Sequence, residues 1–344
     1  MKKIMLVLTI LFGITSWVIE VRGQGIDVVE FPICTDSSYQ LVPDISGNHV
    51  VWHDGRGDGH EIYGYDILSG SEFPVCTNTA YQNHLAISGD IVVWDDARND
   101  PSWDIYGKNL SSGIEFPICT NSGSQEDPAI GGNVVVWMDA RSDNKKHVYG
   151  KNLSTGIEFP ISTDNPHQAF YPVPAISGDY VVWQDYRNSN PDIYGYDLST
   201  GSEFSICTNG ATQHKPAISG DIVVWIDNRD GDPSVYGKDL SSGIEFPICA
   251  NSGDQDDPDI SGDFVVWTDR RNGIAEIFGY DLSTGTEFPI CTGFDSVSPK
   301  ISDNVVVWRD SRNGNYDIYG AYIPEPLSLS LLAFGGLGLI RRRC

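Results

Sequence analysis

Acidic and basic side chains recur together along this chain, in a form that could bind a ligand or hold the fold together. In seven places an aspartate follows a tryptophan by two residues, and an arginine follows that aspartate by two. A carboxylate beside a guanidinium can form charge-assisted hydrogen bonds with a polar ligand or with its partner. Because a catalytic site is normally built once, a motif present in every repeat predicts a structural role, with partly buried charges paired between repeats. The residues are Trp52, Asp54 and Arg56; Trp94, Asp96 and Arg98; Trp137, Asp139 and Arg141; Trp183, Asp185 and Arg187; Trp225, Asp227 and Arg229; Trp267, Asp269 and Arg271; and Trp308, Asp310 and Arg312.

Two further sets of side chains are candidate ligand-binding residues. The first is a glutamine in the loop that enters six of the seven repeats, where an amide could bind sugar hydroxyls or a peptide backbone, or could instead cap backbone groups of its own loop. The second consists of aromatic and histidine side chains that occur in single repeats, which could stack on a carbohydrate or protein, or pack on a neighbouring loop. The glutamines are Gln40, Gln82, Gln125, Gln168, Gln213 and Gln255, and the repeat-specific residues are Trp103, His167, Phe170 and Tyr171.

Metal and catalytic motifs are sparse. Residues 54–61, 227–232 and 254–257 supply carboxylates of the kind that calcium prefers, but none has the complete spacing of an EF-hand loop. We therefore expect no metal site and no cofactor, with calcium binding as an alternative. No nucleophile elbow, H-E-x-x-H motif, phosphate-binding glycine loop or Cys-x-x-Cys pair occurs, and the seven histidines form no recognisable ligand set. These observations predict that the chain is not an enzyme, although a carbohydrate-active site could lie among its many carboxylates.

The elements that position these residues follow from the repeat. The signature tryptophans are 41 to 46 residues apart, and each unit contains several short strand-like segments separated by Gly-Asp, Gly-Asn or Ser-Thr-Gly turns. A period of this length with four strands per unit is typical of a β-propeller blade. The pieces read "PAIS", "IVVW", "DIYGYDL" and "EFPICT". The sequence therefore predicts an all-β, seven-bladed propeller made of four-stranded antiparallel blades.

The strand count predicts how the ring closes. The seventh unit, residues 299–323, lacks its "EFPICT" strand, and a spare copy stands at residues 30–35. We expect this N-terminal strand to complete the last blade, which removes two exposed sheet edges. Six of the seven cysteines occupy one repeat position, with Ser162 in the remaining repeat, so we expect small buried thiols between blades and no disulfides.

The two ends of the sequence predict export. Residues 1–23 contain two lysines, an apolar run and small residues at a cleavage site, as in a secretory signal peptide. Residues 24–323 would form the propeller. Residues 324–344 comprise a Pro-Glu-Pro start, 14 largely apolar residues and an arginine tail, a pattern that can contact a membrane transiently. The residues at the two ends of that segment are Pro324, Glu325, Pro326, Arg341, Arg342 and Arg343.

The negative net charge of the chain limits the classes of partner that it can bind. The chain has 22 Lys and Arg against 47 Asp and Glu, and residues 24–326 have 16 against 46. Such a surface repels nucleic acid and anionic lipid, so we expect neither as a partner. It is compatible with a soluble exported monomer.

The phrase "AISGDIVVW.D.RN...DIYGYDLSTG.EFPICT" resembles the TolB-type, WD40-like propeller repeat of bacterial and archaeal surface proteins, and the resemblance extends over residues 30–323. It implies a six- or seven-bladed propeller outside the cytoplasm, often used to bind partners, and it does not imply one activity. Residues 324–344 resemble the PEP-CTERM sorting signal of Gram-negative bacteria, which implies an exosortase-type protease as a partner.

Taken together, these features predict an exported binding or structural module at the cell surface, in the periplasm or in the extracellular matrix of a Gram-negative bacterium. Its expected ligand is a surface protein or a polysaccharide. One alternative is a carbohydrate-active lyase or hydrolase with its site at the mouth of the central channel. Another is a periplasmic protein-docking factor of the TolB type.

Overall fold

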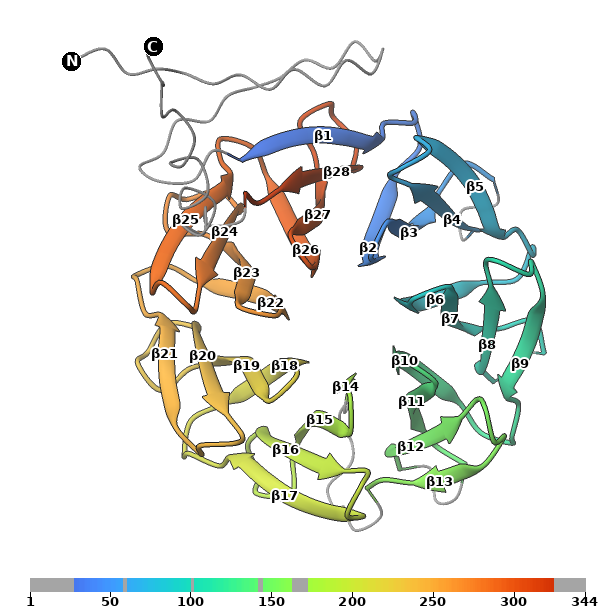
Figure 1. Ribbon diagram of the computed structural model, residues 1–344, viewed down its shortest axis with the longest axis horizontal. Helices are drawn as coiled ribbons and strands as arrows, with labels where there is room; N and C mark the ends of the chain where they lie inside the picture. Colours follow the sequence, from blue (N-terminus) through green and yellow to red (C-terminus); the bar gives the residue numbers. More distant parts are fainter. Residues whose placement is uncertain (1–27, 58–60, 100–101, 142–144, 163–172, 325–344) are drawn as a thin grey trace, which may run out of the picture.

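The repeats form a closed ring of seven sheets around one axis (Figure 1). The computed structural model describes residues 28–57, 61–99, 102–141, 145–162 and 173–324. All elements in these residues are strands, and each sheet has four antiparallel strands. The predicted seven-bladed β-propeller is therefore confirmed.

The blades follow one another along the chain, and the first-named strand of each lies innermost in Figure 1. Blade 1 contains β2 (Gln40–Ser46), β3 (His49–Asp54), β4 (Glu61–Asp66) and β5 (Ser71–Cys76). Blade 2 contains β6 (Gln82–Ser88), β7 (Ile91–Asp96), β8 (Asp104–Asn109) and β9 (Glu115–Cys119). Blade 3 contains β10 (Gln125–Gly131), β11 (Val134–Asp139), β12 (His147–Asn152) and β13 (Glu158–Pro160). Blade 4 contains β14 (Pro174–Ser177), β15 (Tyr180–Asp185), β16 (Asp192–Asp197) and β17 (Ser202–Cys207).

Blade 5 contains β18 (Gln213–Ser219), β19 (Ile222–Asp227), β20 (Ser234–Asp239) and β21 (Glu245–Cys249). Blade 6 contains β22 (Gln255–Ser261), β23 (Phe264–Asp269), β24 (Glu276–Asp281) and β25 (Thr286–Cys291). Blade 7 contains β26 (Ser296–Ser302), β27 (Val305–Asp310), β28 (Asp317–Tyr322) and, as its outer strand, β1 (Val29–Cys34).

The two ends of the ring meet in blade 7, as the strand count predicts. β1 pairs antiparallel with β28, and Val29 lies opposite Tyr322 (Figure 1). At the inner end of the closure, the backbone N–H of Gly47 donates to Ser302 Oγ at 2.9 Å. Closure by the N-terminal strand leaves no blade of this ring with a missing outer strand.

The apolar core lies between neighbouring blades. Each signature tryptophan is fully buried because its side chain is sandwiched between its own sheet and the previous one. Trp52 of blade 1, for example, packs with Ile33 and Val307 of blade 7. The six cysteines of the repeat are also buried and free, which confirms the expectation of unpaired thiols between blades.

The inner strands are longer than the sequence suggests. "PAIS" was expected to be the whole strand, but in six blades the strand begins three residues earlier and contains a β-bulge before the "PAIS" portion. A bulge turns the local backbone and re-aims the side chain at that point. In blade 4 the described part of the inner strand, β14, begins at Pro174 and pairs without a register shift.

The predicted end segments cannot be compared with the structure. Residues 1–23, Glu325, Pro326 and the arginines Arg341, Arg342 and Arg343 lie outside the described residues, and Pro324 is the last residue within them. In the part of the chain that is described, no helix is long and apolar enough to cross a membrane.

Candidate functional site

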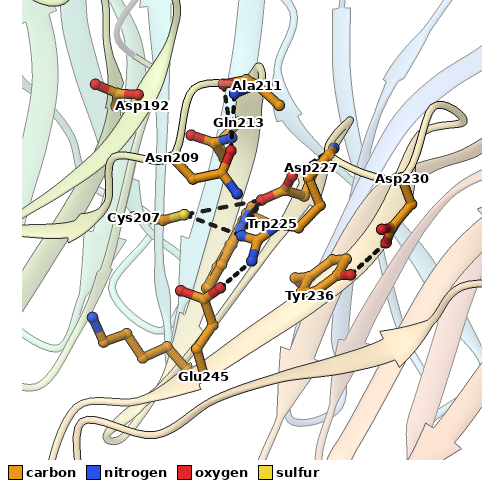
Figure 2. Close-up of polar contacts among 12 residues, drawn as sticks. Asp192, Cys207, Asn209, Ala211, Gln213, Trp225, Asp227, Asp230, Tyr236 and Glu245 are labelled. Atoms are coloured by element: carbon orange, nitrogen blue, oxygen red, sulfur yellow. Dashed lines mark hydrogen bonds and ion pairs between the residues drawn. The ribbon is translucent and has the colours of Figure 1, made fainter.

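The charged side chains of the Trp-Asp-Arg motif bond one another and a glutamate of the same blade. In blade 5, Trp225 Nε1 donates to Asp227 Oδ2 at 3.0 Å, and the Arg229 backbone N–H donates to Asp227 Oδ1 at 2.9 Å (Figure 2). Arg229 also bonds the Glu245 carboxylate on the outer strand of the same blade. Burial alone would raise the pKa of Asp227, but hydrogen bonds from Arg229 and Trp225 outweigh burial and lower it.

The same arginine also reaches the neighbouring blade. Arg229 Nη2 lies 3.2 Å from the Sγ atom of Cys207, which ends the outer strand of blade 4, and its guanidinium lies 4.3 Å from the centroid of the Tyr236 ring. A planar guanidinium can satisfy an aspartate, a glutamate and an aromatic face at once. The motif therefore links three strands of one blade to the previous blade.

The other six blades repeat this arrangement. Their Trp–Asp hydrogen bonds measure 2.8 to 3.4 Å, and each arginine bonds its aspartate and a glutamate of the outer strand. In blade 7 the glutamate is Glu30 of β1, so Arg312 joins the two ends of the ring. The contacts leave little of this motif available to a ligand. The glutamates are Glu30, Glu72, Glu115, Glu158, Glu203, Glu245 and Glu287.

The candidate glutamines begin the inner strands and are buried. Gln40, Gln125 and Gln213 each donate from Nε2 to the carbonyl two residues earlier at 2.8 Å, and Gln82 and Gln255 make the equivalent bond. Their side chains are at most 1% exposed, so the structure places them beneath the surface as loop caps. Gln168 lies outside the described residues.

The repeat-specific residues are described only in part. Trp103 is half-buried, and its carbonyl accepts the backbone N–H of Gln125 at 2.8 Å. His167, Phe170 and Tyr171 lie outside the described residues. Among the residues that are described, no group of three or more His, Cys, Asp or Glu side chains could hold a metal ion.

A ring of variable side chains was missed by the sequence analysis. It comprises the bulged position of six inner strands, two residues after the glutamine, or in blade 7 after the serine that replaces it, and we call it the bulge ring. Each of these non-glycine residues has a positive φ, between 37° and 56°, in the described structure. Such a backbone is uncommon for these residue types and gathers at functional sites. The bulge ring is Val42, His84, Asp127, Lys215, Asp257 and Ser298.

Members of the bulge ring touch across blade boundaries. Lys215 Nζ of blade 5 lies 2.6 Å from Asp257 Oδ1 of blade 6, and 2.7 Å from the adjacent Asp256. Ser298 Oγ of blade 7 donates to Asp257 Oδ2 at 3.2 Å. A signal was present in the sequence, because the residue before the inner-strand proline or leucine takes five different identities in seven blades, whereas the proline itself occurs in six of them.

His84 and Asp127 form the corresponding contact between blades 2 and 3. His84 Nε2 lies 3.3 Å from Asp127 Oδ1, and His84 Nδ1 lies 2.7 Å from Asp95 Oδ2 at the end of β7. Asp95 is 1% exposed, and its Oδ1 atom has no hydrogen-bond partner. We call His84, Asp95 and Asp127 the His84 cluster.

The two carboxylates of the His84 cluster stabilise the protonated form of His84. Burial lowers the pKa of His84, but the hydrogen bond with Asp95 and the charges of Asp95 and Asp127 outweigh burial and raise it. Burial raises the pKa of Asp127 to about 6, against the opposing charge of His84. The two carboxylates therefore favour the protonated, cationic form of His84.

A second charged group lies on blades 6, 7 and 1. Lys300 of β26 is half-buried between Asp259 of β22 and Asp44 of β2, whose charges raise the pKa of Lys300 against burial. Both aspartates also bond the next blade, since Asp44 Oδ2 accepts the N–H of Ile87 at 2.9 Å and Asp259 Oδ2 that of Ile301 at 2.8 Å.

The inner strands as a whole are acidic. They carry six carboxylates, on Asp44, Glu126, Asp127, Asp256, Asp257 and Asp259, against the amines of Lys215 and Lys300. Clefts and rims lined by one sign of charge concentrate ligands of the opposite sign. The bulge ring and its neighbours are therefore suited to a cationic or polar ligand.

Known structures share this fold at low sequence identity. An oligogalacturonate lyase in complex with manganese is 12% identical, with a TM-score of 0.65, and the alignment covers 90% of this chain and 96% of that one. The β-propeller domain of the Trilobed protease from Pyrococcus furiosus, described as having an open velcro topology, is 12% identical with a TM-score of 0.64, over 83% and 97% of the two chains. A puromycin-hydrolysing peptidase from Mycobacterium tuberculosis is 11% identical with a TM-score of 0.63, over 80% of this chain and 49% of that one.

These similarities define the class of protein, a seven-bladed β-propeller, and at 11 to 12% identity they show the fold alone. This chain spans about half the length of the peptidase. No protein-family model matches the sequence, and no curated protein matches it. TolB from Acinetobacter baumannii is 14% identical and aligns with a TM-score of 0.47, over 82% of this chain and 78% of that one.

One expectation needs correction. The absence of catalytic motifs predicted that the chain is not an enzyme, and that prediction is wrong, because propellers of this fold occur in a peptidase and in a lyase. The reasoning failed because local motifs report sites built from neighbouring residues. A propeller can assemble a site from side chains of several blades, which no short motif reveals.

Proposed function

We propose that this chain is an exported propeller that binds a partner with the face on which its inner strands begin, here called the start face. The bulge ring supports this proposal most directly. The Trp-Asp-Arg residues that build the propeller recur in each blade. The bulge-ring positions instead carry five residue types in six blades, and each of these residues has a positive φ. Variation on a constant frame is what a specific binding surface requires.

The proposed partner is a surface protein that presents a basic segment. Six inner-strand carboxylates against two amines favour a cation over the anionic groups of acidic polysaccharides or nucleic acids. Export rests on the expected signal peptide of residues 1–23, and attachment rests on processing of residues 324–344 by an exosortase-type protease. The cell surface and the extracellular matrix of a Gram-negative bacterium are the proposed locations.

A binding screen tests this function. The protein is applied to peptide and glycan arrays, with and without calcium, beside the double variant Asp256→Asn/Asp257→Asn on the start face. Leu68→Ala is a matched control, because Leu68 is 79% exposed in the β4–β5 turn on the opposite face. We expect saturable binding to basic peptides that the double variant weakens and the control retains. Equal binding by all three proteins would contradict the assignment of the start face.

A carbohydrate-active lyase or hydrolase at the start face is the second candidate. The observation that favours it is the orientation of His84, whose Nδ1 is held by the buried Asp95 as in many proton-transferring histidines. Incubation of the bound glycans with the protein, followed by mass spectrometry, separates the two functions. New oligosaccharide products that disappear in His84→Ala would favour the enzyme over the binding module.

A further inference from the structure

Two boundaries between blades present the same pair of positions with different cations. At the boundary of blades 5 and 6, Lys215 of the bulge ring contacts the bulge-ring carboxylate of the next blade, Asp257. At the boundary of blades 2 and 3, the equivalent residues are His84 and Asp127. The backbones match as well, with φ values of 53° and 37° for Lys215 and His84, and of 47° and 51° for Asp257 and Asp127.

The two boundaries differ in how the carboxylate is neutralised. The ammonium of Lys215 lies 2.6 Å from Asp257, so that carboxylate has a permanent partner. Among the described residues the Asp127 carboxylate contacts His84 Nε2, at 3.3 Å, and an imidazole is a cation only while it carries its second proton. His84 is also shorter than lysine and its side chain is 44% exposed, so a ligand can approach the pair from solvent.

The buried Asp95 carboxylate fixes the orientation of the His84 ring. Asp95 is almost completely buried, yet only its Oδ2 atom is bonded, to His84 Nδ1 and to the backbone N–H of Asp127 at 3.1 Å. Because Asp95 holds Nδ1 of His84, the other ring nitrogen, Nε2, is the one that faces Asp127.

We propose that the His84 cluster is a subsite for the ammonium group of a partner's lysine side chain, which takes the position that the ammonium of Lys215 takes at the blade 5–6 boundary. This rests on the proposed function, and it names the group that the start face recognises. An ammonium has three N–H donors and can bond the Asp127 carboxylate and the Nε2 lone pair of His84 together. His84 must give up its Nε2 proton to accept that bond, so binding releases a proton to solvent.

A lysine side chain is favoured over a metal ion and over an amino sugar. An ammonium needs only hydrogen-bond acceptors, which Asp127 and Nε2 of neutral His84 provide. A lysine carries its ammonium on a flexible four-carbon stem that can reach between two blades, whereas the amine of an amino sugar sits directly on a bulky ring.

The charges around His84 determine how the affinity for the ammonium group changes with pH. The carboxylates that face it raise its pKa, and the ligand must displace the proton that they hold, so affinity rises with pH until His84 is neutral. The charged groups that act on His84 are Asp95 of β7 and Glu126 and Asp127 of β10, and Lys146 lies 3.1 Å from Glu126.

The experiment uses tetralysine as the probe and the full-length protein. Calorimetric titration at pH 6 in two buffers of different ionisation enthalpy measures both affinity and the number of protons released. We expect release of a proton from His84 and, because the pKa of Asp127 is about 6, of a further fraction of a proton from Asp127, so the affinity falls as the pH is lowered. Chemical shifts of the histidine ring nitrogens, measured by NMR, should show His84 becoming neutral when tetralysine binds.

The variant His84→Lys supplies the ammonium internally, as Lys215 does. It should fold like the wild type, bind tetralysine at least about tenfold more weakly and release no proton. The control Leu68→Ala should behave as the wild type. Unchanged affinity or unchanged proton release in His84→Lys would overturn the proposal, and so would a preference for glucosamine oligomers over tetralysine.

The outcomes also separate this proposal from the proposed function. Binding of basic peptides that depends on Asp256 and Asp257 but not on His84 would refute the subsite and leave the start face as the binding surface. Absence of any binding by the wild type on peptide and glycan arrays would refute both.

Discussion

The ion pair that closes the ring should stabilise the folded protein more than the equivalent ion pairs of the other blades. Arg312 Nη1 donates to Glu30 Oε2 at 2.9 Å, and the two side chains are 9% and 7% exposed. The equivalent pair of blade 1, Arg56 and Glu72, is 24% and 32% exposed. We therefore expect Glu30→Ala to destabilise the protein considerably more than Glu72→Ala.

The size of the difference follows from burial. Removing one partner of a buried ion pair costs about 3–5 kcal/mol when the other charge is left alone, whereas an exposed pair contributes about 0–1 kcal/mol. Arg312 keeps its bonds to Asp310 after Glu30 is removed, which reduces the loss. We expect a coupling free energy of about 2 kcal/mol for Arg312 and Glu30, against less than about 1 kcal/mol for Arg56 and Glu72.

Equilibrium urea unfolding of two double-mutant cycles measures these values. One cycle uses Glu30→Ala, Arg312→Ala and the double variant, and the other uses Glu72→Ala, Arg56→Ala and their double variant. Both arginines bond an aspartate of their own loop, so that contribution cancels within each cycle. Equal coupling energies in the two cycles would refute the conclusion that the closing pair is special because it is buried.

Three further predictions concern the frame and the His84 cluster. Trp225→Phe should lower the free energy of unfolding in urea by about 2–4 kcal/mol, because it removes buried volume and the hydrogen bond to Asp227; a loss below about 1 kcal/mol would contradict the role of that bond. Because burial raises the pKa of Asp127 in the folded protein to about 6, above its value in the unfolded chain, its stabilising contribution is complete below about pH 4 and is lost as the pH rises through 6. Asp127→Asn should therefore become more stable relative to the wild type between pH 4 and pH 7 in urea titrations, and a constant difference would argue against the raised pKa. Burial raises the pKa of Cys207 to about 11, so this thiol and the equivalent cysteines of the other blades should not react with a thiol reagent at pH 8 until urea is added. Rapid labelling of the native protein would contradict their burial.

The frame could be predicted because its signals are local and are repeated. A β-branched run ending in tryptophan, a glycine turn and an "EFPIC" segment each identify a strand or turn, and seven copies remove the ambiguity of any one of them. The missing seventh "EFPIC" segment also predicted the partnership of β1 with β28, although the two strands are almost the whole chain apart. The partner of each Trp-Asp-Arg arginine on the outer strand was not predicted, because side-chain reach across a sheet leaves no periodic signal.

The candidate site was predicted only in part. The glutamines near the start of each inner strand had two interpretations, ligand binding or capping of their own loop, and in the structure Gln40 and its described equivalents are buried and cap their loops. The residue two positions further along was overlooked because it varies. Only the bulge, which gives His84 and Lys215 a positive φ, turns these side chains toward the next blade.

The sequence by itself determined the number of blades, the strands in each, the closure of the ring and the acidic character of the surface, because these depend on repetition and composition. The tertiary structure decided which charges meet. His84 and Asp127 are one repeat apart in the chain, and they come within 3.3 Å because neighbouring inner strands lie side by side around the axis. Contacts between blades depend on the rotation from one sheet to the next and on bulges within strands, and neither quantity is encoded in the residues of a single repeat.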